Sequence, residues 1–295
     1  MTTDNPEVRS AYDLPKLGIA SFIAECDTMP KQDEIIEGIL PKGQVMLLTG
    51  DPYEGKSLEV QYLAIAFGAG SEYHGLNVKK CRALYLTWEG SGQGLAARFK
   101  KILNGTTPDI EPWIKMLPEP TPFNTAAGYG IIANLLHNAK QEQNIEVVIY
   151  DSYPYTIVGK LNKDEVVNEW WSIMTKLHHD LELTPIFIFE QRKLLWGREP
   201  EERFSLDRLK GAKTLAYKAN TVVAIGKNMI YRWVPEAQKT KYVQDGSLIM
   251  PLKVKDAVGL FKPLRVDLNR DTCLFNGQRW EFDENTKIFD AIACE

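Results

Sequence analysis

The stretch G-D-P-Y-E-G-K-S at residues 50–57 decides the fold that we expect for this chain. It fits the phosphate-loop pattern G-x-x-x-x-G-K-[ST]. An apolar run of strand length precedes it at 45–49, and the stretch 58–67 that follows looks helical. A strand that passes through such a loop into a helix points several backbone N–H groups at one place, where the helix dipole also favours an anion. The sequence therefore predicts a nucleotide site.

Each residue type in this loop has an expected task. Lys56 is expected to reach the β- and γ-phosphates of a nucleotide, and the Ser57 hydroxyl is expected to bind Mg²⁺. Glu54 places a negative charge close to the phosphates, which we expect to weaken nucleotide affinity slightly. The predicted nucleotide-binding residues are Gly50, Asp51, Pro52, Tyr53, Glu54, Gly55, Lys56, Ser57 and Leu58.

Composition narrows the class of protein. The chain has 295 residues, of which 44% are hydrophobic and 25% charged, values typical of a soluble protein with one large α/β core. No apolar run approaches the roughly 18 residues of a membrane span, and the N-terminus does not resemble a signal peptide. The four cysteines are scattered without a C-x-x-C pair, which favours reduced thiols over zinc ligands or disulfides. We therefore expect a cytoplasmic protein with no membrane partner.

Charge is unevenly distributed along the chain. The net charge is −4, but residues 192–218 hold eight basic and four acidic residues, so this segment carries +4 and the remainder −8. A local basic segment on an acidic body favours a confined anionic partner over a broad one. A solvated loop of mixed charge is the alternative.

Strand-like apolar runs alternate with helical patterns along most of the sequence. Residues 1–30 are expected to form an arm or linker, and residues 31–295 one domain. The expected strands are 45–49, 83–88, 113–117, 147–150, 186–189 and 221–225. The expected helices are 33–40, 58–67, 94–103, 129–140 and 166–181. This alternation predicts an α/β fold with a mostly parallel twisted sheet flanked by helices.

The pattern changes after residue 225. Short strands joined by turns are expected there, with no helix between them. Their ranges are 229–234, 248–254, 264–268 and 273–275. They predict antiparallel strands that extend the C-terminal end of the sheet.

Polar residues follow three of the predicted parallel strands. Asp151 ends an apolar strand and is expected to hold a water bound to Mg²⁺. Glu89, expected on the strand adjacent to the phosphate loop, could polarise the attacking water; a solubilising acid at a strand end is the alternative. Glu190 and Gln191 end the third strand, where a polar side chain could sense hydrolysis and pass the change to the basic segment.

In their order and spacing these segments resemble the RecA-like ATPases of the hexameric-helicase branch, meaning the DnaB-type replicative helicases and the plasmid RepA type. The resemblance runs from about residue 36 to residue 281. The matching segments are G-Q-V-M-L-L-T-G-D-P-Y-E-G-K-S (43–57), L-Y-L-T-W-E-G-S-G-Q-G-L-A-A-R-F (84–99), E-V-V-I-Y-D-S (146–152), P-I-F-I-F-E-Q-R-K (185–193), S-L-D-R-L-K-G-A-K-T-L-A-Y-K-A-N-T-V-V-A-I (205–225) and P-L-K-V-K-D-A-V-G-L-F (251–261). The resemblance implies that residues 31–295 form a RecA-like ATPase domain.

The resemblance also implies catalytic roles. Glu89 corresponds to the general base, and Arg98 is a matching basic residue. Ser57 and Asp151 correspond to the residues that hold Mg²⁺. In the family, this strand ends in a Gln or His that senses hydrolysis. If positions are counted forward from Pro185, Gln191 corresponds to this sensor. If they are counted back from the basic residues that follow, Glu190 corresponds to it. The implied catalytic residues are Glu89, Lys56 and Gln191.

Residues later in the chain match the parts of the family that act between subunits and on DNA. Lys253 or Lys255 would supply a trans-acting cation to the γ-phosphate of a neighbouring subunit, since Asn220 stands where RepA-like proteins can carry an arginine finger. The residues that would line a DNA channel are Arg208, Lys210 and Lys213.

The function implied by the resemblance is that of an ATPase with ATP and Mg²⁺ as cofactors. Such a protein would assemble as a homo-oligomer, a hexamer, and act on single-stranded DNA as a helicase or translocase in replication. Two alternatives stay open: a RecA-like recombination or annealing mediator without unwinding, and a KaiC-like regulatory ATPase ring acting on protein. A P-loop small-molecule kinase explains neither the ordered resemblance nor the antiparallel end.

Overall fold

A computed structural model describes residues 18–28, 33–105, 107–160, 163–191, 204–206, 209, 213–234, 238–255 and 263–277. The chain divides into two compact units, Met1–Asp33 and Glu34–Glu295. The first unit contains α1 (Ile19–Thr28), a helix that was not predicted from the sequence. All other helices and strands among the described residues belong to the second unit.

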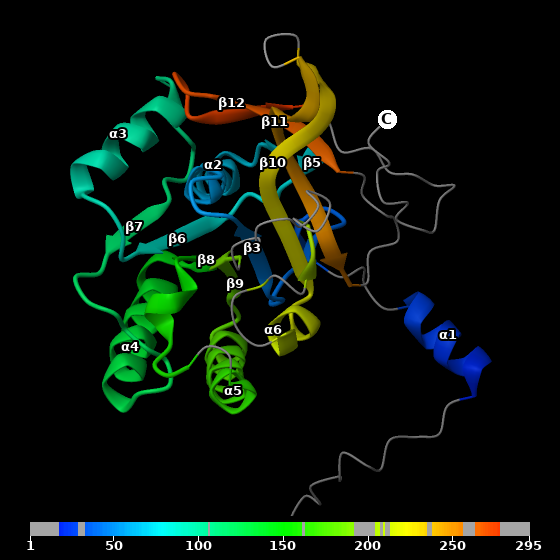
Figure 1. Cartoon of the computed structure of the whole chain (residues 1–295). Helices are drawn as coiled ribbons and strands as arrows, with labels where there is room; N and C mark the ends of the chain where they lie inside the picture. Colours follow the sequence, from blue (N-terminus) through cyan, green and yellow to red (C-terminus); the bar gives the residue numbers. More distant parts are fainter. Residues whose placement is uncertain are drawn as a thin grey trace, which may run out of the picture. The chain divides into compact units, whose positions relative to one another are not determined.

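A nine-stranded sheet runs through the second unit (Figure 1). Its strands are β3 (Met46–Gly50), β6 (Arg82–Thr87), β7 (Trp113–Met116), β8 (Ile145–Asp151), β9 (Thr184–Glu190), β10 (Thr221–Val234), β11 (Lys239–Val254), β12 (Leu264–Asn269) and β13 (Leu274–Gly277). Their order is β13-β12-β11-β10-β3-β9-β8-β6-β7. Neighbours from β7 to β10 pair in parallel, and those from β10 to β13 pair antiparallel. The predicted mostly parallel sheet with antiparallel strands at its C-terminal end is confirmed.

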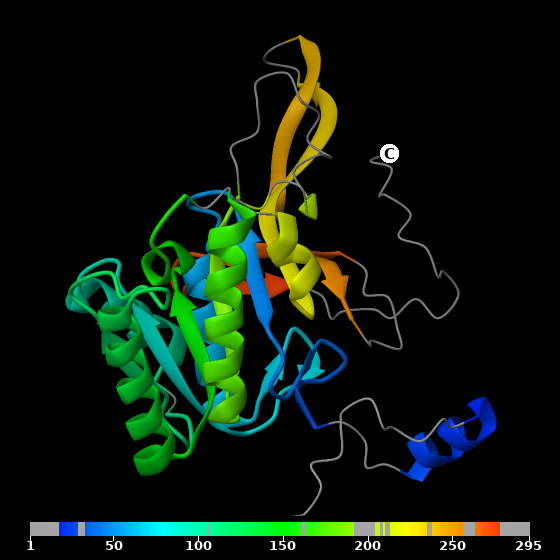
Figure 2. The same cartoon turned by 90° about the horizontal axis from the view of Figure 1, so that it is seen from below.

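Helices cover both faces of this sheet, as Figures 1 and 2 show. They are α2 (Lys56–Ala69), α3 (Gly92–Leu103), α4 (Ala126–Gln143), α5 (Asp164–Asp180) and α6 (Lys213–Lys218), with one 3₁₀ turn, η1 (Tyr153–Thr156). Along β3, Met46 and Leu48 belong to the core shared with α2 and α3, whereas Leu47 belongs to the core shared with α4, α5 and α6. Because successive strand residues point to opposite faces and both faces are buried, the predicted strands are apolar runs.

Local sequence sets where two of these helices begin and end. Ser91 and Thr125 are the N-caps of α3 and α4, and their hydroxyl oxygens accept hydrogen bonds from backbone N–H groups of the first turn. Asn104 and Asn144 close the same helices in the left-handed conformation, which asparagine tolerates well. The predicted helices 94–103 and 129–140 are therefore confirmed, with slightly longer bounds.

The helix expected at residues 33–40 is wrong. This segment forms the antiparallel pair β1 (Glu34–Ile36) and β2 (Leu40–Pro41). Ile35 and Ile36 are both fully buried, and β-branched side chains favour strands. Gly38, at φ 67°, turns the chain between the two strands in a conformation that a helix does not contain. A second small hairpin, β4 (Glu72–Tyr73) with β5 (Leu76–Asn77), was not predicted from the sequence.

The strands predicted at 221–225 and 229–234 are one continuous strand, β10, and the strand predicted at 248–254 is the last part of β11. Together they form a long hairpin that extends beyond the sheet (Figures 1 and 2). Only residues 221–225 of β10 pair with β3. The register shifts between Lys227 and Met229, so the stretch expected to be a turn is an irregularity inside a strand.

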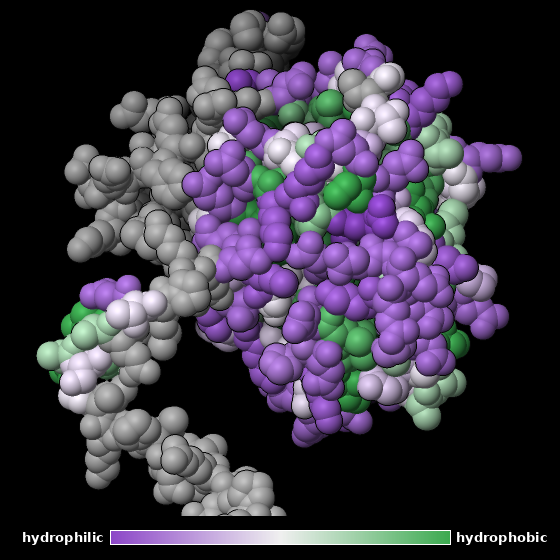
Figure 3. Space-filling model, turned by 180° about the vertical axis from the view of Figure 1, so that it is seen from behind, coloured by the Kyte–Doolittle hydropathy of each residue, from purple (hydrophilic) through white to green (hydrophobic). Residues whose placement is uncertain are grey.

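The face of the protein seen in Figure 3 is largely hydrophilic, with hydrophobic residues in separate small groups. Within the described ranges, no helix has both the length and the apolar content that crossing a membrane requires.

Candidate active site

The loop at residues 50–57 joins β3 to α2, as predicted. Gly55 is the N-cap of α2 with a φ of 90°, a left-handed conformation that favours glycine. A Cβ added to Gly55 would lie 2.5 Å from the Phe275 ring of β13. A Cβ added to Gly50 would lie 2.2 Å from the carbonyl oxygen of Ile225 in β10. Close packing against two strands of the sheet therefore fixes the position of the loop.

The Lys56 side chain lies within the turn of this loop. Its Nζ donates hydrogen bonds to the carbonyl oxygens of Gly50 at 3.0 Å and Asp51 at 2.8 Å. Burial lowers the pKa of Lys56, and nearby carboxylates oppose that shift. These carboxylates are Glu190, Asp151, Asp51 and Glu54, in decreasing order of effect. The lysine is thus surrounded by acids, so a bound polyphosphate here requires further positive charge.

Asp151 lies at the end of β8 and is buried beside the phosphate loop. Burial raises the pKa of Asp151, and the Glu89 charge raises it further. Hydrogen bonds from Tyr85 and Ser57 and the charge of Arg98 oppose the rise. The Tyr85 hydroxyl donates to Oδ2 of Asp151 at 2.5 Å. The structure therefore brings together Ser57 and Asp151, the two residues predicted to hold a metal.

Glu89 follows β6, which is not adjacent to β3, so the expected adjacency is wrong. β9 and β8 lie between them, because the chain crosses from β3 to β6 and fills the gap later. Glu89 nevertheless reaches the site. Its Oε1 accepts a hydrogen bond of 3.1 Å from the Ser152 hydroxyl, directly after Asp151 in the chain. A carboxylate thus lies close to the Ser57–Asp151 pair, held by its own hydrogen-bond donor.

Arg98 extends from α3 toward the carboxyl ends of the parallel strands, where Glu89 and Asp151 lie. Its Nη2 would lie 3.5 Å from a Cβ added to Gly90, next to Glu89. Burial raises the pKa values of both Asp151 and Tyr85, and the Arg98 charge opposes that rise. The basic residue that the resemblance matched is therefore electrostatically part of the site.

Glu190 and Gln191, the two candidate sensor residues, both lie against the phosphate loop. Glu190 is the register partner of Gly50, and the Gln191 N–H donates to the Gly50 carbonyl at 3.1 Å. Gln191 is 4% exposed, and its Nε2 has no hydrogen-bond partner among the described residues. Gln191 also forms an antiparallel bridge with Leu209. That bridge places Gln191 and Leu209, the residues that flank the segment 192–208, next to each other beside the loop.

The residues present fit a nucleotide with Mg²⁺. The hydroxyl of Ser57 and the carboxylate of Asp151 are oxygen ligands of the kind Mg²⁺ prefers, and Gln191 has a buried unpaired donor beside the loop. Across the described part of the chain, no group of three or more His, Cys, Asp or Glu residues is placed to hold a metal.

The two lysines expected to act in trans lie in different surroundings. Lys253 Nζ donates to the carbonyl oxygens of Ala216 at 2.8 Å and Tyr217 at 2.5 Å, near the end of α6. Burial, helped by the Lys255 charge, lowers the pKa of Lys253 to about 8. The Lys255 side chain is exposed, while its N–H donates to the Asn220 carbonyl. Of the two, Lys253 is already bound to carbonyls of its own chain.

The residues predicted to contact DNA cannot be placed together. Arg208 and Lys210 lie outside the described residues, and of Lys213 only the backbone, at the start of α6, is described.

Several residues at the site were not predicted from the sequence. Ser152 could have been noticed, because it directly follows Asp151 in a quoted motif. Tyr85 lies inside an apolar strand, where nothing marks its hydroxyl as a partner of Asp151. Lys227 lies on β10, and its Nζ is 3.9 Å from Oε1 of Glu54 in the phosphate loop. The acid expected to weaken nucleotide affinity therefore has a nearby cation.

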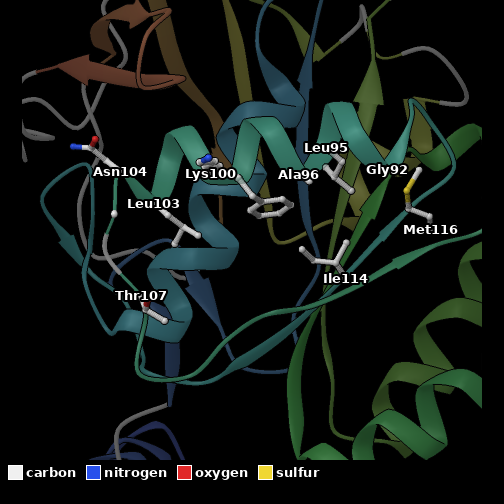
Figure 4. Close-up of a pocket in the computed structure, with 11 residues that line it drawn as sticks. Gly92, Leu95, Ala96, Lys100, Leu103, Asn104, Thr107, Ile114 and Met116 are labelled. Carbon is white, nitrogen blue, oxygen red and sulfur yellow. The ribbon is translucent and has the colours of Figure 1, made fainter.

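A mainly apolar groove of about 780 Å³ lies at the β7 edge of the sheet. In Figure 4, Leu95 and Leu103 of α3 face Ile114 of β7 across it. Gly92 and Met116 line one end of it.

Residues 14–193, more than half of the chain, match the protein family described as "AAA domain". No curated protein matches the sequence. Among solved structures, the chain is similar to a KaiC-like protein from the hyperthermophilic archaeon Pyrococcus horikoshii, with 16% identity and a TM-score of 0.48. That similarity covers 84% of this chain and 96% of the other.

Proposed function

The chain belongs to the AAA domain family, and we propose that it is a Mg²⁺-dependent ATPase that acts on single-stranded DNA as a homo-oligomeric helicase or translocase. One observation supports hydrolysis above all. The parallel strands bring Lys56, the Ser57–Asp151 pair and Glu89 to one edge of the sheet, with Glu89 fixed by Ser152. This arrangement combines phosphate binding, metal binding and a base for water, which are the parts that phosphoryl transfer to water requires.

In this mechanism the loop N–H groups and Lys56 bind the phosphates. Ser57 and Asp151 would hold Mg²⁺, which would supply the charge neutralisation that the surrounding acids make necessary. Glu89 accepts a proton from the attacking water, and Ser152 keeps its carboxylate in position. Arg98 offsets part of the negative charge of Asp151.

A further cation is assigned to a neighbouring copy of the chain. Charge on the transferred phosphoryl group needs stabilisation beyond Lys56 and the metal. Lys255 is the first choice, because its side chain is exposed while Lys253 is bound to the carbonyls of α6. The active form is then a ring or filament, and a hexamer is the form that we propose.

Action on DNA rests on the segment 192–218. Its net charge is +4. The Gln191–Leu209 bridge joins the two residues that flank the stretch 192–208, and Gln191 lies beside the phosphate loop. A change at Gln191 on hydrolysis would therefore move the base of this segment. We assign Arg208, Lys210 and Lys213 to contacts with DNA phosphates, which steer and hold a nucleic acid without reading its sequence. We place this activity in the cytoplasm.

ATPase rate with and without single-stranded DNA, native mass, and strand displacement on a forked duplex together test this function. We expect a multimer whose Mg²⁺-dependent turnover is stimulated by DNA and which displaces the strand. Stimulation without displacement would replace the helicase with a recombination or annealing mediator. An ATPase rate that is the same with and without single-stranded DNA would instead favour an ATPase ring acting on protein. Absence of any ATP turnover would overturn the proposal as a whole.

A further inference from the structure

Glu54 and Lys227 form an ion pair at the phosphate loop. The Glu54 side chain is only 6% exposed, and the Lys227 Nζ lies 3.9 Å from its Oε1. The Lys227 side chain itself is 46% exposed. A nearly buried carboxylate inside a phosphate loop is costly without a cation, and it opposes an incoming anion. Lys227 offsets both effects in the nucleotide-free chain.

The sheet places Lys227 beside the loop. Ile225 of β10 is the register partner of Gly50, the last residue of β3. Val223 and Ile225 both belong to the core on the α2 side of the sheet. Because side chains alternate along a strand, Lys227 continues that row beyond the end of β3, where the loop turns into α2. The register irregularity follows directly after Lys227, and such bulges re-aim side chains next to active sites.

The charge balance at the site favours a second lysine. Lys56 faces the four acids Glu190, Asp151, Asp51 and Glu54, and the Arg98 charge acts on Asp151 as well. A nucleoside triphosphate adds several further negative charges in the same place. A lysine carries a compact charge on a flexible stem, and Lys227 is half exposed at the outer limit of ion-pair contact with Glu54. The Lys227 ammonium can therefore move from the single Glu54 carboxylate to phosphate oxygens, which carry more negative charge.

We propose that Lys227 is a second phosphate-binding cation supplied by the same chain as Lys56. It pairs with Glu54 when the site holds no nucleotide and moves to the phosphates of a bound nucleoside triphosphate. Glu54 thereby keeps the Lys227 ammonium beside the loop. When a nucleotide binds, its phosphates replace the Glu54 carboxylate as the anion that Lys227 contacts. This inference rests on the proposed function, because it requires the loop to bind a nucleotide.

A double-mutant cycle on nucleotide affinity tests the exchange. The probe is the non-hydrolysable ATP analogue AMP-PNP with Mg²⁺, and its Kd is measured by calorimetry for four proteins: wild type, Lys227→Met, Glu54→Gln and the double variant. We expect Lys227→Met to weaken binding about tenfold, the loss of one charge-assisted contact. Glu54→Gln should tighten binding a few-fold, because it releases Lys227 and removes a repulsive charge.

The double variant decides between binding and mere neutralisation. If Lys227 contacts the phosphates, the double variant binds about tenfold more weakly than Glu54→Gln. If Lys227 only neutralises Glu54, the double variant and Glu54→Gln bind equally well, and that result would overturn the inference. A Lys227→Met variant with wild-type affinity would overturn it too. Should Lys227→Met fail to fold, Lys227→Gln removes the same charge with a polar side chain and carries the same expectations.

Two controls separate this inference from the proposed function. Lys115→Met removes an exposed lysine from the edge strand β7, which β3, β9, β8 and β6 separate from β10, and should leave the Kd unchanged. Lys56→Ala should abolish binding. If wild type fails to bind AMP-PNP, the proposed function fails first and the inference with it. If wild type binds and Lys227→Met binds equally well, only the inference fails.

Discussion

Ser152 is the residue that holds Glu89 in place. Its hydroxyl donates to Glu89 Oε1 at 3.1 Å, and Ser152 is 4% exposed, whereas Glu89 lies at the exposed end of the site. Without this donor the Glu89 carboxylate can rotate away from the attacking water. We therefore expect Ser152→Ala to lower kcat about tenfold with little change in KM, because nucleotide binding does not depend on the hydroxyl.

Steady-state ATPase measurements check this expectation. Ser172→Ala, which removes an exposed serine of α5, is the matched control and should keep the wild-type kcat. A wild-type kcat in Ser152→Ala would show that Glu89 is positioned by other contacts.

His178 is a buried histidine whose two ring nitrogens are both hydrogen-bonded. Nδ1 donates to the Met174 carbonyl and Nε2 accepts from the Tyr150 hydroxyl, each at 2.7 Å. Burial lowers the pKa of His178 to about 4, although the bond to Met174 opposes the shift. The neutral ring is therefore part of the core under β8.

The lowered pKa of His178 predicts how stability depends on pH. Between pH 6.5 and about 4 the unfolded chain binds a proton that the folded chain does not, so the free energy of unfolding falls as pH falls through this window. From pH 7 to pH 5 we expect wild type to lose on the order of 2 kcal/mol more than His178→Gln. Urea unfolding at both pH values measures this difference. His179→Gln, at an exposed neighbour, should behave like wild type, and equal losses in all three proteins would contradict the assignment.

At the residue scale, the sequence could predict the parts of the site that a local pattern carries. Lys56 and Ser57 belong to one contiguous motif, and Asp151 ends an apolar strand, so their roles follow from chain order and parallel-strand geometry. Tyr85 and Lys227 could not be found in this way. They reach the site only through sheet pairing and side-chain direction, which no local pattern encodes.

Gly55 shows how an element outside the loop shapes the phosphate site. Its φ of 90° suits glycine, and an added Cβ would lie 2.5 Å from Phe275 of β13. Gly55→Ala should therefore both strain the backbone, at a cost of about 1–3 kcal/mol, and push β13 from the N-terminus of α2. We expect it to abolish detectable AMP-PNP binding and lower the Tm.

Gly105→Ala is the control for Gly55→Ala. Gly105 has a φ of 81°, but a Cβ there would meet no atom within 4 Å, so only the backbone strain remains. It should lower the Tm less and leave AMP-PNP binding intact. Equal effects of the two substitutions on nucleotide binding would rule out the contact with Phe275 as the cause.

At the element scale, long elements with strong periodicity were predictable and short or paired ones were not. The central strands β3, β9 and β8 and the helices α2 to α5 could be predicted from the spacing of their apolar residues. The antiparallel pair of β1 and β2 was predicted to be a helix. The few apolar residues of this segment fit both the helical period of about 3.6 residues and the strand period of 2, and only packing decides between the two structures. The length of the β10–β11 hairpin depends on an irregularity at Lys227 that accommodates a glycine-containing stretch within one strand.

At the scale of the whole molecule, the proposed site is shared between two copies of the chain. Lys56 and Glu89 would come from one copy and Lys255 from its neighbour. Glu89→Gln and Lys255→Met should each be inactive alone. When the two are mixed in equal amounts, random assembly yields about a quarter of interfaces with every group intact, so about a quarter of wild-type ATPase should return.

Mixing Glu89→Gln with Lys56→Ala is the control for this complementation. Both changes fall in the same half of the site, so no mixture contains an intact interface and no activity should return. Failure of Glu89→Gln and Lys255→Met to complement would remove Lys255 from the trans role. Complementation in the control mixture would show that the observed activity has another source.

Hydrolysis of bound ATP by Glu89→Gln tests the central claim most directly, namely that this edge of the sheet activates water against a nucleotide held by the 50–57 loop. We predict that Glu89→Gln binds Mg²⁺·ATP with the wild-type Kd, since phosphate and metal contacts come from Lys56, Ser57 and Asp151. Its single-turnover rate should fall about 100-fold or more, because the amide cannot accept the proton. Hydrolysis at the wild-type rate by nucleotide-bound Glu89→Gln would contradict the account.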